Sequence, residues 1–146
     1  MSDPGQEIAD AIVTHLNAQD LGFGFAAASP EDPQKEINFD GMGDPHVGTK
    51  CFVIPVADSE EKIDKAGVIM SPTINVFVSR FLSGKDGVTR RVMDDFVHDI
   101  RTTIRFVQMA GYHWQGTETV TKYDPDKLRT QDRFFAVLAL SYVNVE

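Results

Sequence analysis

The clearest pattern near the start of the chain is an apolar stripe at helical spacing. Asp3 is a candidate N-cap, Pro4 suits the first helical position, and Gln6 has the spacing of a capping box. Gly22 is a candidate stop signal. The pattern therefore predicts an amphipathic helix over residues 3–20. Its apolar stripe consists of Ile8, Ile12, Val13 and Leu16.

A second helical pattern lies in the middle of the chain. Apolar residues recur there every three or four positions, so that they form one stripe that must pack on a sheet or on another helix. The spacing predicts a helix from Thr89 or Arg90 to Ala110, ended by Gly111. The stripe consists of Val92, Phe96, Ile100, Ile104 and Val107.

The remaining patterned segments have the features of strands. Residues 133–145 are apolar on both faces, which is typical of a strand in the middle of a sheet that is covered on both sides. Residues 50–56 are also apolar on both faces, and Pro55 places the end of that strand toward a sheet edge. The expected strands are 23–28, 36–39, 50–56, 68–82 (interrupted at 71–72), 117–123 and 133–145.

The segments between these elements are polar and rich in turn residues. Residues 29–49 are rich in Pro, Gly and Asp, and we expect an exposed excursion at about 40–49. Residues 58–67 read as a charged connection and 83–87 as a turn. Tight connections between successive strands favour antiparallel pairing. The sequence thus predicts one α+β domain over residues 1–146, with a mixed, mostly antiparallel sheet flanked by two amphipathic helices.

The charge of the chain is acidic and unevenly distributed. It has 14 Lys and Arg against 22 Asp and Glu, a net charge of −8. This balance argues against a protein that grips nucleic acid or docks on an anionic membrane. Residues 1–66 hold 4 basic and 13 acidic side chains, and residues 67–146 hold 10 and 9. Surfaces of opposite sign would suit self-association, although solvated acidic loops explain the asymmetry equally well.

Few residues carry recognisable chemistry. The single cysteine, Cys51, lies in an apolar run and reads as a small core residue. The chain shows neither a secretory signal nor an apolar run long enough to cross a bilayer, so we expect synthesis in a reducing cytoplasm. The four histidines have no short-range ligand partners. We therefore expect no metal and no cofactor.

An enzyme interpretation is distant. The candidate pair is His98 with Asp94 or Asp95 on the second helix, which would need a deep pocket to serve a small hydrolase. Pairs of this kind more often support a helix at its surface. The cluster formed by Tyr112, His113 and Trp114 reads as an aromatic plug at the helix end that covers the core. We expect no catalysis.

The order of elements resembles a known protein family. An amphipathic helix is followed by the strand CFVIPVA at 51–57, a polar connection, the strand TINVFV at 73–78, a helix over 93–106 and the ending RTQDRFFAVLALSY at 129–142. This order and texture resemble the tail terminator (tail completion, neck) proteins of tailed bacteriophages. The resemblance covers most of the chain and is weakest over residues 29–49.

The resemblance implies a structural role in the virion. Members of the family form a six-fold ring on the head-proximal end of the tail tube, stop tube growth and present a surface to the head-side connector. The implied partners are therefore further copies of the chain in a homo-hexamer, the tail tube protein and the connector or head-closure protein. DNA passes through the lumen, and a net-negative chain would repel a passing duplex.

Two sets of residues are candidate contacts under this hypothesis. Acidic residues of the polar connection would meet basic residues of the second half in a neighbouring subunit. These are Glu60, Glu61 and Asp64 on one side, and Arg90, Arg91, Arg129 and Arg133 on the other. The excursion, with Asp40, Met42, Asp44 and His46, would contact the tube or the connector.

Other interpretations stay open beside the terminator. One is another neck ring, a head-closure or adaptor protein on the portal side. A related cap of an injection machine outside phages is a second, and the small hydrolase is a third.

Overall fold

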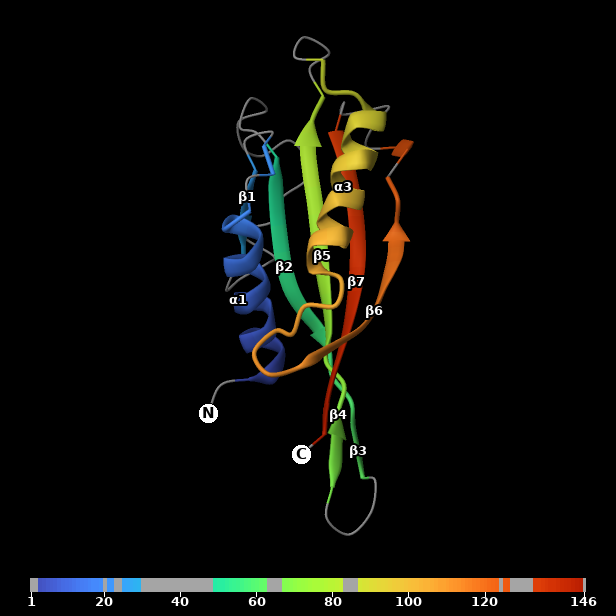
Figure 1. Ribbon diagram of the computed structural model, residues 1–146. Helices are drawn as coiled ribbons and strands as arrows, with labels where there is room; N and C mark the ends of the chain where they lie inside the picture. Colours follow the sequence, from blue (N-terminus) through green and yellow to red (C-terminus); the bar gives the residue numbers. More distant parts are fainter. Residues whose placement is uncertain are drawn as a thin grey trace.

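The computed structural model describes residues 3–19, 21–22, 25–29, 49–62, 67–82, 87–123, 125–126 and 133–145. Two helices and seven strands lie in these ranges (Figure 1). The elements are α1 (Pro4–Asn17), β1 (Ala26–Ala28), β2 (Lys50–Ala57), β3 (Glu60–Lys62), β4 (Val68–Met70), β5 (Thr73–Phe81), α3 (Arg90–Ile104), β6 (His113–Thr121) and β7 (Arg133–Val145).

The strands form one mixed sheet built around β7. The order is β1-β2-β5-β7-β4-β3, and β6 pairs with β7 on the side opposite β5. Only β1 and β2 are parallel, and every other pair is antiparallel. The predicted α+β class with a mostly antiparallel sheet is therefore confirmed. The position of residues 133–145 in the middle of the sheet is confirmed as well, because β7 pairs with β5, β6 and β4.

Both helices pack on the same face of the sheet (Figure 1). The helix side chains that reach the sheet are fully buried, such as Ile8 and Ile12 of α1 and Ile100 of α3. They meet alternate residues of β5 and β7, including Val76 and Leu138. His15 Nε2 lies 3.0 Å from the carbonyl oxygen of Thr103, which joins the two helices directly.

The opposite face of the sheet carries no helix in the described part of the chain. Its side chains on the three long strands are largely apolar and half-buried, with Phe77 of β5 stacked on Phe135 of β7 at 6.0 Å between ring centroids. The pattern correctly indicated two apolar faces for β7. We expected both faces of the sheet to be covered, but the described helices cover one face only.

The first helix begins as predicted but is not capped as predicted. Asp3 is the N-cap and Pro4 opens the helix, yet the Asp3 side chain makes no capping hydrogen bond. The helix ends at Asn17 with Ala18 as its C-cap, four residues before Gly22. The expected end was too late because Asn17 turns its side chain onto β1, where its amide bonds both the N–H and the carbonyl of Ala27.

The second helix is shorter than predicted. It ends at Ile104 rather than Ala110, because Arg105 leaves the helical conformation and Phe106 has a positive φ of 65°. Residues Met109 and Tyr112 then close a tight turn through reciprocal backbone hydrogen bonds of 2.9 and 2.8 Å. Val107 therefore does not belong to the helical stripe. β6 consequently starts at His113 and not at Thr117, with His113 opposite Val143 of β7.

Part of the predicted charged connection is a strand. Residues Glu60–Lys62 pair with Val68–Met70 as the hairpin β3–β4, and β4 pairs with the end of β7. This three-stranded projection, which we call the arm, extends beyond the helices at one end of the molecule (Figure 1). β1 covers β2 only up to Phe52, so Pro55 lies at an open edge of the described sheet as expected. The strand expected at 36–39 lies outside the described residues.

Candidate functional site

The acidic contact candidates lie on the arm. Glu60 and Glu61 belong to β3, and both side chains are exposed. They pair in register with Met70 and Ile69 of β4, so β3 presents its outer edge away from the sheet. Asp64 lies outside the described residues. The sequence therefore placed two carboxylates correctly on the surface, and the structure adds that they belong to a strand edge.

The basic candidates differ in how far they are engaged within the chain. Arg90 donates to Asp94 Oδ2 one helical turn later and lies 4.9 Å over the ring of Tyr123. Arg133 donates to the hydroxyl of Ser79 at 3.0 Å. Arg91 is exposed at the start of α3, and Arg129 lies outside the described residues. Of the three described basic candidates, Arg91 is thus the most accessible to a partner.

The acidic and basic candidates lie at opposite ends of the molecule. β3 is in the arm at one end, whereas α3 and β7 both begin at the other end (Figure 1). These charges therefore do not meet within one chain. Asp40, Met42, Asp44 and His46, the residues expected to contact the tube or connector, lie outside the described residues, and their role stays a prediction.

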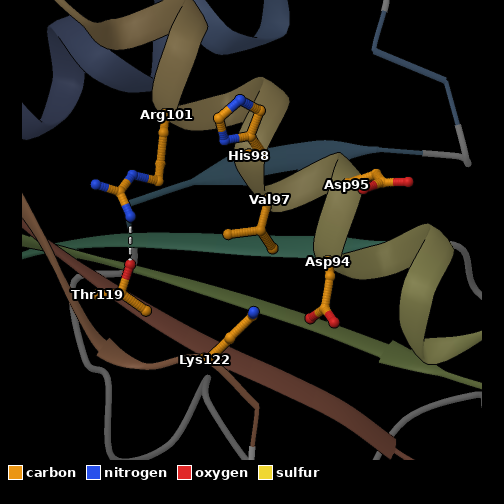
Figure 2. Close-up of a pocket in the computed structure, with 7 residues that line it drawn as sticks. All are labelled: Asp94, Asp95, Val97, His98, Arg101, Thr119 and Lys122. Atoms are coloured by element: carbon orange, nitrogen blue, oxygen red, sulfur yellow. Dashed lines mark hydrogen bonds between the residues drawn. The ribbon is translucent and has the colours of Figure 1, made fainter.

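A pocket of about 390 Å³ opens between α3 and β6 (Figure 2). Asp94 is one of its acidic lining residues; its Oδ2 accepts from Arg90, and its buried Oδ1 has no hydrogen-bond partner among the described residues. The side chain of Lys122 extends into the same space from the end of β6 (Figure 2). The pocket is lined by Asp94, Asp95, Val97, His98, Arg101, Thr119 and Lys122.

Arg101 forms one wall of this pocket and fixes α3 to β6. It donates to the Thr119 hydroxyl at 2.5 Å and to the Thr117 carbonyl at 3.5 Å. Both hydrogen bonds of the guanidinium therefore hold the helix and the strand together. Figure 2 shows this bond as a dashed line between Arg101 and Thr119.

The hydrolase interpretation called for a deep pocket around His98 and the neighbouring aspartates, and it stays a hypothesis. His98 and the two aspartates do line a hollow, as that interpretation needs. The lining contains neither serine nor cysteine. The cysteine of the chain, Cys51, is buried in the core, and burial raises the pKa of its thiol to about 12. Among the described residues there is also no cluster of three or more potential metal ligands.

The aromatic cluster after α3 is part core and part surface. Tyr112 is buried, as expected for a plug over the core, and Trp114 is half-buried against the same core. His113 is exposed. Sequence reasoning missed Phe106, which is 81% exposed and packs edge-on against Trp114 at 5.0 Å. The available signal was that Phe106 lies off the apolar stripe of the helix.

Comparisons with known proteins find similar solved structures but no similar sequence. No protein-family model matches the sequence, and no curated protein does. Among solved structures, the chain is similar to a chain of the virion of a native gene transfer agent particle, with a TM-score of 0.54 and 12% identity. The match covers 99% of this chain and 100% of that chain. The likeness is one of fold.

No helix in the described ranges has both the length and the apolar character needed to span a membrane.

Proposed function

We propose that this protein is a structural component of a phage-like virion, with no catalytic role. The observation that carries the proposal is the fold likeness to a chain of a gene transfer agent virion, which extends over essentially the full length of both chains. The resemblance of the sequence to tail terminator proteins points in the same direction. The fold likeness and the sequence resemblance, neither of which depends on a shared motif, therefore both indicate a virion structural protein.

Within that class, the proposed role is that of a tail terminator. Copies of the chain form a ring, a hexamer in this family, on the head-proximal end of the tail tube. The ring ends tube growth and joins the tail to the head connector, and DNA passes through its lumen without specific binding. The net charge of −8 supports this because a net-negative chain would repel a passing duplex.

The separation of charges supports contacts between copies. A ring needs a heterologous contact, in which two different patches of each subunit meet. Glu60 and Glu61 lie on the arm and Arg91 and Arg133 at the opposite end, so only another copy can bring them together. The Arg90 guanidinium, already bound to Asp94, contributes less. Charge pairs of this kind fix the register of a contact more than its affinity.

Negative-stain images of the purified protein, alone and mixed with tail tubes, test the role. We expect rings, either free or seated on one end of each tube. A chain that stays a single protomer in both samples contradicts the proposal. Reversing both charges, with Glu60→Lys and Glu61→Lys, should reduce ring assembly. Unchanged assembly would remove these residues from the contact but would leave the ring itself in place.

A head-closure or adaptor protein is the second candidate because it would also form a neck ring in the same virion. The two differ in partner. Co-purification with the tail tube protein supports a terminator, and co-purification with the portal-side connector supports the alternative.

A further inference from the structure

The turn after α3 displays an aromatic side chain that the fold does not bury. Phe106 is 81% exposed, the most exposed of the large apolar residues in the described part of the chain. Its ring packs edge-on against Trp114, whose indole N–H donates to the Thr117 hydroxyl at 3.0 Å. Trp114 is thus fixed in place and holds the Phe106 ring in one position on the surface.

The backbone at this position is strained to present that ring. Phe106 has a φ of 65°, a left-handed conformation that bulky L-residues rarely adopt. Glycine or asparagine would adopt it at lower cost. A strained residue with an exposed aromatic side chain is more consistent with a binding anchor than with a packing role.

The charge around the anchor is unusual for this chain. Residues 100–117 contain no Asp or Glu, although the whole chain has a net charge of −8. Arg105, next to Phe106, is exposed, and so is His113 at the start of β6. The turn therefore combines an apolar anchor with an adjacent cation, and it fits a partner surface with an apolar residue beside carboxylates.

Such a surface is present on the chain itself, at the base of the arm. Val56 is 49% exposed at the bulge where β2 ends. The residues that follow it, Asp58, Glu60 and Glu61, are all exposed and acidic. No ion pair engages these carboxylates or Arg105 within the described ranges. An exposed apolar side chain thus stands next to unpaired carboxylates, which is the complement of the turn.

We propose that the Phe106 turn of one copy docks on the Val56 surface of a second copy, with Arg105 facing the carboxylate of Asp58. This deepens the proposed function, since it rests on self-association and gives Asp58, at the base of the arm, a counterpart beside the arginines proposed for Glu60 and Glu61. When each copy gives its turn to one neighbour and its Val56 surface to the other, the contact is heterologous and can propagate around a ring.

Sedimentation of the purified full chain over a range of concentrations tests the pairing. Phe106→Asn keeps a residue that tolerates a positive φ and removes the ring, so the fold is retained and near-unchanged thermal unfolding checks this. We expect the variant to weaken self-association by about tenfold. Val56→Asn should weaken it similarly. Val120→Asn is the control, because Val120 is 57% exposed on β6 and outside both patches.

A double-mutant cycle separates direct contact from indirect effects. If the two side chains meet, Phe106→Asn combined with Val56→Asn should weaken association less than the product of the two single effects. Arg105→Glu should weaken association, and Asp58→Lys should restore it in the Arg105→Glu background.

The outcomes distinguish this proposal from the ring itself. Association of the wild type that Phe106→Asn leaves unchanged overturns the docking proposal and leaves the ring standing. Association lost in Arg91→Glu but not in Phe106→Asn also overturns it, in favour of the arginine contact. A wild type that remains a monomer at every concentration removes the self-contact, and the images with tail tubes then decide the ring separately.

Discussion

The first turn of α1 packs so closely on β2 that one added methyl group should destabilise the fold. A Cβ at Gly5 would lie 2.9 Å from the Cβ of Pro55 and 3.4 Å from Oδ2 of Asp3. The Asp3 side chain can rotate away. The Pro55 carbon belongs to a ring fixed to the backbone, so relief requires α1 to move away from the sheet.

Two opposing effects decide the sign of the Gly5→Ala substitution. Alanine in place of glycine favours the helix by at most about 1 kcal/mol. Overpacking in a buried contact costs about 1–3 kcal/mol. The overlap with Pro55 is with a rigid group, so we expect the cost to exceed the gain and the free energy of unfolding to fall by about 1 kcal/mol. For a chain of this length, that lowers the Tm by about 2–4 °C.

Urea unfolding monitored by circular dichroism measures this difference, and Gly116→Ala is the matched control. Nothing lies within 4 Å of a Cβ built on Gly116 in β6, and this glycine has no positive φ. The control should therefore be neutral or slightly stabilising. A Gly5→Ala variant as stable as the wild type would refute the argument, because it would mean that α1 can shift at no cost.

Three further predictions concern polar groups that the fold buries or holds by hydrogen bonds. Among the described residues, the buried Tyr142 hydroxyl has no hydrogen-bond partner. Tyr142→Phe should therefore raise the free energy of unfolding by about 1 kcal/mol in the same urea assay, and a loss of stability would reveal a partner. Burial raises the pKa of Cys51 from 9.0 to about 12, so the unfolded chain loses this proton at a lower pH than the folded chain does. The free energy of unfolding should therefore fall as the pH rises above about 9. Urea midpoints at increasing pH should shift less in Cys51→Ala than in the wild type, and an equal shift would refute the assignment. Asn17→Ala removes two hydrogen bonds to Ala27 and should cost about 1–3 kcal/mol by thermal unfolding, whereas a loss below about 0.5 kcal/mol would indicate that water replaces the amide.

The positions of the main elements could be predicted because side-chain periodicity reports which faces are buried. The stripe from Phe96 to Ile104 identified α3, and the two apolar faces of residues 133–145 identified the central strand. The end of α3 could not be predicted. Residues 105–110 have ordinary helix propensity, yet Arg105 leaves the helical conformation and Phe106, whose ring packs against Trp114, adopts a left-handed one.

The candidate site was less accessible from the sequence. Glu60 and Glu61 were correctly expected on the surface, since consecutive carboxylates need solvent. Arg90, one of the proposed interface cations, already forms an ion pair with Asp94 one helical turn later. The sequence alone did not show which charges would pair within the chain. The pocket lies between α3 and β6, where Arg101 bonds Thr119 across 18 positions of sequence. Tertiary packing decides which strand a helix packs beside, so no local sequence pattern could predict this pocket.

The position of β7 in the sheet has a consequence for how the chain acquires its structure. This strand joins β5 on one side to β6 on the other and also holds β4 of the arm, yet it comes last among the described elements. During synthesis, β5 and β6 would each wait with an unpaired edge until residues 133–145 emerge, because their common neighbour does not yet exist. Folding is therefore dominated by contacts made late and over long sequence separations, which slows it and lengthens the time during which open edges can pair wrongly. Translation speed and chaperone supply should accordingly limit the yield of soluble protein more than its final stability does.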